Sequence, residues 1–196
     1  MARTLDTKSA NGRRSIYIVP EVEVKDPTTT RAEITRLLQE EGIIDRKKCD
    51  FYPATETSSC YMVGDNNLAA FTIDENEVDV AFQQCVIYGH ARATIVPQEA
   101  AVLPQCPACG ADVTQDYYDF INSERDVRTP LICRSCGKES RVDALKDRND
   151  NKEILITNLF VSFDETNGCS QIKPLWLEQF NRKSGIKFRV LSYWYT

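Results

Sequence analysis

Hydrophobic and polar residues alternate near the start of the chain, in the segment SIYIVPEVEV (15–24). A period of two predicts a β-strand with one apolar face. The apolar face comprises Ile16, Ile18, Val22 and Val24. Pro20 shares this face and has no backbone N–H, so it predicts a position at a sheet edge or a bulge.

The segment 26–42 shows the helical period instead. Its apolar residues, spaced as on one side of a helix, are Ile34, Leu37 and Leu38. Thr30 and Glu33 have the spacing of a capping box, in which each side chain accepts a hydrogen bond from the other's backbone. Gly42 is placed to end the helix in a left-handed conformation. We expect a helix that covers a sheet.

A second helix is predicted over 173–185. Pro174 suits the first helical turn, Trp176 and Phe180 lie four residues apart, and Gly185 follows the last turn. The basic residues favoured at a helix C-terminus are Arg182 and Lys183.

Shorter apolar runs predict the remaining strands. The run 58–64 ends in a Gly64-Asp65 turn, and 76–89 is expected to pair with 91–97 across a Gly89-His90 turn. The run 153–163 is strongly apolar and is predicted as a central strand, and 186–196 as the last one. A charged run between them, 143–153, is typical of a linker.

These elements predict an α+β fold, with a mixed or antiparallel sheet, two helices and an inserted lobe. We expect a polar tail (1–14), a first part of the body (15–103), the lobe (104–142) and a second part of the body (153–196). The tail carries Arg3, Lys8, Arg13 and Arg14 against Asp6. It is read as a solvated end, with a partner-binding basic arm as the alternative.

Composition limits the functional classes. The chain has 196 residues and is 42% hydrophobic, enough for one domain with a smaller insert. Its net charge of −5 disfavours binding to nucleic acid through bulk electrostatics. No apolar run is long enough for a membrane span, and the first residues lack the apolar core of a secretory signal.

Four of the eight cysteines follow the pattern C-x2-C-x23-C-x2-C: Cys106, Cys109, Cys133 and Cys136. Each pair lies on a tight turn, CPACG or CRSCG, and four thiolates in tetrahedral geometry suit Zn²⁺. Gly110 and Gly137 allow the positive φ that directs N–H groups toward the sulfurs.

This pair of turns resembles a zinc ribbon, over residues 104–142 only. Rubredoxin-like modules use the same four thiolates for iron, which the larger context makes the less favoured metal. The resemblance implies a structural metal, because four cysteines leave no coordination position for water or substrate.

The other four cysteines show no pairing pattern: Cys49, Cys60, Cys85 and Cys169. Without a signal peptide we expect ordinary thiols in a reducing compartment, the cytoplasm.

Nucleic-acid contact is one possible role of the lobe. Its basic residues over 104–148 are Arg125, Arg128, Arg134, Lys138, Arg141, Lys146 and Arg148. Its acidic residues there are Asp112, Asp116, Asp119, Glu124, Asp126, Glu139, Asp143 and Asp147. The two sets nearly balance, so only a small patch at Arg134 and Lys138 supports this role.

Protein binding is the second possible role, because the spacer between the two turns interleaves aromatic and acidic residues. The simpler interpretation is that Tyr117, Tyr118 and Phe120 form the lobe's own small core.

An enzymatic role has the least support. The single histidine, His90, is expected in a turn, and a Cys85–His90 pair is too vague to define a catalytic site. No P-loop, GxGxxG, GxSxG or HExxH motif occurs, so no catalytic residue is assigned. The pattern therefore favours a non-catalytic, zinc-stabilised protein that binds another protein, of adaptor, inhibitor or immunity type. A nucleic-acid-associated zinc ribbon and an enzyme with an unrecognised site remain the alternatives, and the oligomeric state is open.

Overall fold

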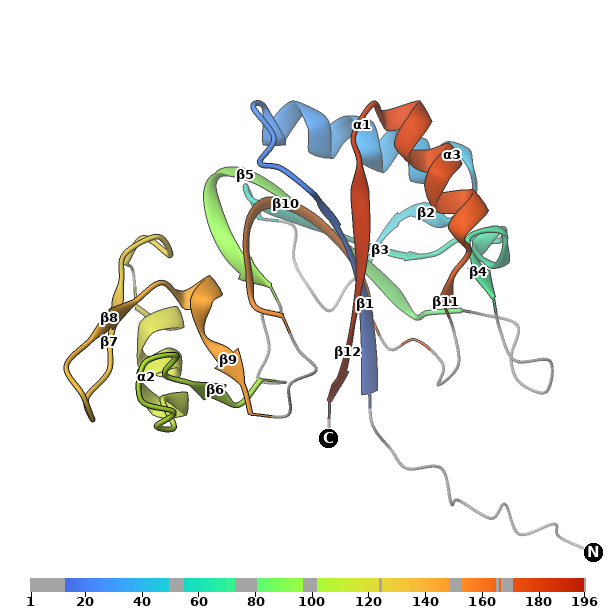
Figure 1. The fold of residues 1–196 in the computed structure, drawn as a ribbon. Helices are drawn as coiled ribbons and strands as arrows, with labels where there is room; N and C mark the ends of the chain where they lie inside the picture. The colour runs from blue at the N-terminus through green and yellow to red at the C-terminus, as the bar shows by residue number, and fades with distance from the viewer. Residues whose placement is uncertain are drawn as a thin grey trace, which may run out of the picture.

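The structure, a computed structural model, describes residues 13–49, 55–72, 81–96, 102–123, 125–148, 153–164, 166 and 171–195. Its centre is a six-stranded sheet in the order β12-β1-β10-β5-β3-β2 (Figure 1). All neighbouring strands of this sheet are antiparallel. These strands are β1 (Arg13–Pro20), β2 (Ile44–Lys48), β3 (Ser58–Val63), β5 (Gln84–Val96), β10 (Leu155–Asp164) and β12 (Phe188–Tyr195). The α+β class, the antiparallel sheet and the central place of 153–163 are confirmed.

The remaining elements of the described residues are short strand pairs, helices and 3-10 turns. Three two-stranded pairs are β4 (Phe71–Thr72) with β11 (Gln171–Ile172), β6 (Pro104–Gln105) with β9 (Lys146–Asp147), and β7 (Leu131–Ile132) with β8 (Glu139–Ser140). The helices are α1 (Pro27–Glu40), α2 (Thr114–Ile121) and α3 (Pro174–Ser184), with 3-10 turns η1 (Asn67–Ala69) and η2 (Val142–Ala144).

Helices α1 and α3 lie on the same face of the sheet (Figure 1). Between helices and sheet is a continuous apolar core in which Phe71, Phe82 and Phe163 meet with ring centroids 5.0 to 5.5 Å apart. Trp176 stacks on Phe180, as their helical spacing predicts, and its indole N–H donates to Glu41 beyond the end of α1. The body is thus held by apolar burial, with a polar link between its helices.

The start of α1 differs from the prediction. Asp26 is the N-cap, and its carboxylate accepts the backbone N–H of Thr29. Hydrogen bonds from the side chain of Thr29 and from its backbone lower the pKa of Asp26. The prediction of a capping box between Thr30 and Glu33 is therefore wrong. Pro27 already occupies the first helical turn, which moves the cap one turn earlier than Thr30.

Pro20 does not place its strand at the sheet edge. Strand β1 lies between β12 and β10, and Pro20 is its last residue. The pairing with β10 covers only Ile16 to Ile18, so no ladder bond to β10 requires an N–H at Pro20.

The predicted hairpin at Gly89-His90 is wrong, because β5 runs without a turn from Gln84 to Val96. Its partner β10 has an irregular register there, since Leu159 opposes Gly89 whereas Thr157 opposes Thr94. The extra residues of β5 therefore form a bulge. Gly89 serves close packing instead of a turn: a Cβ on it would lie 2.5 Å from the carbonyl oxygen of Pro27 in α1.

Both β5 and β10 curve beyond this bulge (Figure 1). The curved ends cover the face of the sheet that carries no helix. Val96 and Leu155 pack there with an aromatic group of Tyr17, Tyr88, Phe160 and Tyr193. The Tyr193 hydroxyl donates to the carbonyl oxygen of Glu153, 2.5 Å away. Both faces of the central strands β1 and β10 are therefore buried.

The lobe lies in the connection between β5 and β10, where Figure 1 shows it beside the sheet. Arg128 joins it to the body through an ion pair with Glu23, N to O 2.6 Å. Part of the predicted linker belongs to the lobe, because β9 pairs with β6 and Leu145 is buried in the lobe's core. Most of the predicted tail (1–12) lies outside the described residues, whereas Arg13 and Arg14 already belong to β1.

Candidate metal centre

The four predicted ligands come together in the lobe. The Sγ atoms of Cys106, Cys109, Cys133 and Cys136 all lie within 4.8 Å of one another. Sγ of Cys106 is 3.9 Å from that of Cys136, and Sγ of Cys109 is 3.8 Å from that of Cys133. A tetrahedral ion with metal–sulfur bonds of about 2.3 Å requires sulfurs about 3.8 Å apart. The geometry therefore fits a metal ion bound by four cysteines, in a site compatible with a zinc ribbon.

Each cysteine pair lies on the same kind of backbone turn. The N–H of Gly110 donates to the carbonyl of Cys106, and that of Gly137 to the carbonyl of Cys133. Both glycines have positive φ, 72° and 69°. A side chain at either position would meet no neighbour but would have to adopt a left-handed conformation. The conformation of the turn, rather than lack of space, accounts for these glycines.

The two sulfurs of each pair differ in exposure. Cys106 and Cys133 are buried at 2% and 1% exposure, and both belong to the lobe's apolar cluster. Cys109 and Cys136 are exposed. Two ligands thus anchor the site to the lobe's core, while the other two close it from outside.

The proximity of the sulfurs has an electrostatic consequence. The backbone N–H of Ala108 lowers the pKa of Cys106 to about 7. At Cys109 the backbone N–H of Ala111 is the largest single influence and lowers the pKa, but the sulfur of Cys136, burial and the other two sulfurs together outweigh it and raise the pKa to about 12. Four thiolates at this spacing repel one another, so a cation among them is what allows all four to ionise together.

The spacer between the two turns forms α2, which the sequence interpretation missed. Tyr117 and Phe120 are buried in the lobe's cluster, so the predicted small core is confirmed for these two rings, whereas Tyr118 is half-buried. The apolar spacing Val113, Tyr117, Phe120 is a helical signal that would have revealed α2.

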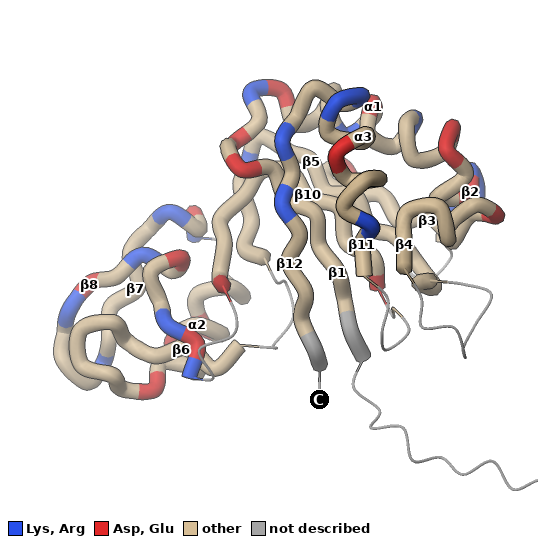
Figure 2. The backbone as a smooth tube through the Cα atoms, turned by 45° about the vertical axis from the view of Figure 1, so that its right-hand side comes forward, with Lys and Arg blue, Asp and Glu red and all other residues tan. Residues whose placement is uncertain are grey.

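Arg134, beside the second turn, is engaged within the lobe. Its Nε lies 2.6 Å from Oδ1 of Asp116, and its Nη2 lies 2.9 Å from Oδ2 of Asp119. Both acids are in α2, so this arginine ties the helix to the second cysteine turn. The other basic residues of the lobe in ion pairs are Arg128, Arg141 and Arg148. Figure 2 shows basic and acidic positions interspersed over the lobe.

Cys85 and His90 do not form a site. Cys85 is fully buried in the body's core, where burial raises the pKa of its thiol well above the ordinary value. His90 is half-buried in the bulge of β5, and its Nδ1 accepts the backbone N–H of Arg92. It is therefore a bulge residue and not the turn residue that was predicted.

Two of the four scattered cysteines are not free thiols. Cys49 and Cys60 form a disulfide, with Cα atoms 5.5 Å apart. The expectation of ordinary thiols is wrong for this pair and confirmed for Cys85. Cys169 lies outside the described residues. Sequence spacing held no signal for the pair, because the strand pairing of β2 with β3 brings the two residues together.

Comparison with protein-family models, curated proteins and solved structures finds no match for this chain. Over the part of the chain that the structure describes, no helix has both the length and the apolar character needed to cross a bilayer.

Proposed function

We propose that the four cysteines hold a structural Zn²⁺ ion, which stabilises a lobe of a non-catalytic binding protein. The observation that carries the proposal is the saturated ligand set: four sulfurs within 4.8 Å of one another, two pairs of them at the 3.8–3.9 Å spacing of a tetrahedral site. Catalytic zinc sites keep a position open for water or substrate, and this set provides none. Zinc is preferred to iron, because the module is fused into a larger α+β body.

The proposed partner is another protein. The chain is acidic, and ion pairs within the molecule already occupy four of the basic side chains of the lobe. Phosphate binding would require these cations to be available. The lobe also exposes an apolar side chain, Ile132, at 59%, next to the ligand Cys133. An adaptor, inhibitor or immunity protein in the cytoplasm is the class that these properties support.

Metal analysis of the purified protein tests whether the four cysteines hold a zinc ion. We expect one zinc ion per chain by elemental mass spectrometry, and loss of that ion in a Cys133→Ser variant. A coloured protein with one iron per chain would show that the site binds iron and not zinc. A metal-free protein whose lobe stays folded would contradict the structural role.

Affinity capture from native lysate, with and without nuclease, tests whether the partner is another protein. We expect nuclease-resistant capture of a protein partner. Ile132→Asp should reduce this capture, whereas Leu175→Asp is the matched control, because Leu175 is an equally exposed apolar residue (66%) on α3 of the body. Capture that nuclease abolishes would favour the nucleic-acid role instead. Equal loss in both variants would argue against the lobe as the binding surface.

A further inference from the structure

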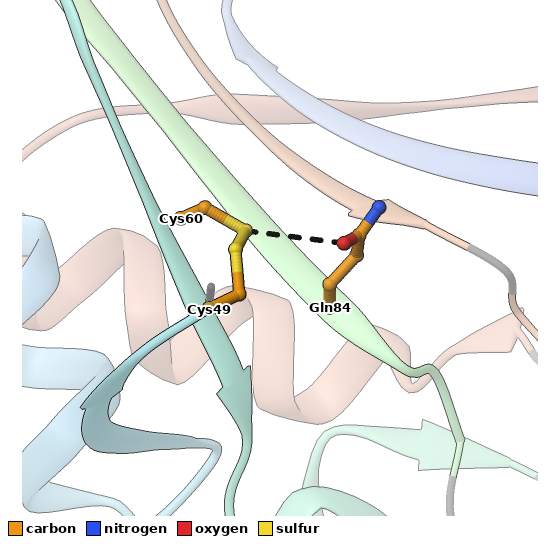
Figure 3. Close-up of a disulfide and its surroundings, with 3 residues drawn as sticks. All are labelled: Cys49, Cys60 and Gln84. Carbon is orange, nitrogen blue, oxygen red and sulfur yellow. Dashed lines mark hydrogen bonds between the residues drawn. A yellow bond between two sulfur atoms is a disulfide. The ribbon is translucent and has the colours of Figure 1, made fainter. Parts of the chain in front are cut away.

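The disulfide joins the outermost strand of one sheet edge to its neighbour. Cys49 directly follows β2, and Cys60 lies within β3, eleven residues further on (Figure 3). Both residues are buried, at 4% and 2% exposure. The disulfide is separate from the metal centre, because its cysteines belong to the body and the four metal ligands to the lobe.

The two ends of β2 are held in different ways. At its start, Ile43 and Ile44 are buried in the main core, and the N–H of Gly64 donates to the carbonyl of Ile43. The following residues, 45–48, are all exposed and charged. The register with β3 is irregular there, because only Ile44 with Val63 and Lys48 with Tyr61 are paired. Apolar burial therefore anchors one end of β2 and contributes little at the other.

The far end of β2 depends on Cys49. Its N–H donates to the carbonyl of Cys60 at 3.1 Å, and its sulfur is bonded to that of Cys60. The other restraint at this end is the pairing of Lys48 with Tyr61. Each backbone hydrogen bond contributes only about 1 kcal/mol net, so the few bonds here give limited resistance to opening without the covalent bond. The disulfide is thus the main restraint on this end of the strand.

We propose that Cys49 and Cys60 form a redox-controlled link at the sheet edge. The disulfide holds the end of β2 against β3, and reduction of the disulfide releases this strand end. Release exposes backbone N–H and C=O groups of β3 at the edge, which is the kind of surface that pairs with an extended segment of another chain. In a reducing cytoplasm the two cysteines are thiols at rest and form the disulfide on oxidation, since disulfides there are mainly transient or redox-sensing.

The redox step needs a thiol reductant, such as glutathione. One glutathione thiolate attacks a sulfur of the pair and forms a mixed disulfide, and the other cysteine leaves as a thiolate. A second glutathione attacks the mixed disulfide, so the protein gains two thiols and the reductant becomes oxidised glutathione. Because both sulfurs are buried, the attack requires local opening of this edge. Gln84 Oε1 lies 4.0 Å from Sγ of Cys60, so it is placed near the thiol hydrogen that reduction creates (Figure 3).

Amide hydrogen exchange on the zinc-loaded protein in oxidised and reduced glutathione tests this proposal. We expect reduction to raise exchange at Lys48 and Cys49 at least tenfold, with little change at Ile43 and no loss of zinc. The variant Cys49→Ser/Cys60→Ser should exchange like the reduced protein in both buffers. A Cys85→Ala variant should keep the full response, because Cys85 is not part of the pair.

Two results would overturn the proposal. One is equal exchange at Lys48 and Cys49 in oxidised and reduced protein. The other is peptide mapping of the oxidised protein in which Cys49 and Cys60 are not joined to each other.

Discussion

The body and the lobe are stabilised in different ways. The body buries a continuous set of aliphatic and aromatic side chains between its sheet and two helices. The lobe buries a smaller cluster, and two of its members are the candidate metal ligands Cys106 and Cys133. Two others, Ile95 and Ile154, come from the ends of the strands that carry the lobe. Small units cannot bury enough apolar surface to fold alone, so a metal can supply what the lobe's core lacks.

Metal removal should give the largest difference in stability between the two regions. Structural zinc contributes about 10 kcal/mol or more to the folding of small zinc modules. We therefore expect a chelator, or Cys133→Ser, to unfold the lobe and leave the body's sheet intact. Loss of protection from hydrogen exchange at Tyr117 with unchanged fluorescence of the two tryptophans, Trp176 and Trp194 of the body, would show it. If Trp176 also became exposed to solvent, the body and the lobe would be one cooperative unit.

A core truncation in the body should have the opposite effect: it should destabilise the body and leave the lobe's metal content unchanged. Phe163 is fully buried among Phe71 and Phe82, and Phe163→Ala should cost about 3–5 kcal/mol of unfolding free energy. Urea unfolding followed by tryptophan fluorescence measures it, because both tryptophans, Trp176 and Trp194, belong to the body. Zinc content of the folded variant should stay at the wild-type value. Zinc loss in parallel with the loss of stability would contradict independent stabilisation of the lobe.

Gly89→Ala tests the contact between α1 and the bulge of β5. The added methyl group would lie 2.5 Å from the carbonyl oxygen of Pro27 and 2.7 Å from Cβ of Arg31. Overpacking of this kind costs about 1–3 kcal/mol. Thermal unfolding should report the loss. Gly185→Ala serves as the comparison, because it adds a methyl at a left-handed φ of 68° with no atom within 4 Å and so measures a conformational cost without a clash. A Gly89→Ala protein as stable as wild type would show that α1 can move away freely.

Gly137→Ala should have a smaller effect, confined to the lobe. The position has φ of 69° and open space around it, so the cost is conformational, about 1–2 kcal/mol. Weaker zinc retention in a chelator competition, with unchanged urea unfolding of the body, is the expected result. Wild-type zinc retention would mean that the turn tolerates a side chain.

Arg134→Ala should have the smallest effect on stability. The guanidinium is 71% exposed, and such ion pairs contribute about 1 kcal/mol or less. We expect a slightly less stable lobe, with a difference from wild type that shrinks at high salt. A loss that salt does not change would point to packing of the arginine on α2 instead of charge.

Local patterns predicted the elements whose signal lies in consecutive residues. The helix over 173–185, its end at Gly185 with φ of 68°, and the central strand over 153–163 all follow from such signals. The metal ligands were also predicted locally, because each cysteine turn is a short-range structure. By contrast, the glycine at position 89 has the local appearance of a turn and serves a contact with a helix about sixty residues earlier.

The sequence by itself determined the class of the fold and the four residues that can hold a metal. These depend on hydrophobic period and on ligand spacing, which neighbouring residues carry. Only the tertiary structure decided that Cys49 meets Cys60, that Arg134 is bound by α2, and that β5 continues past Gly89. Each of these depends on which distant segments lie side by side, and strand pairing and helix packing bring those segments together.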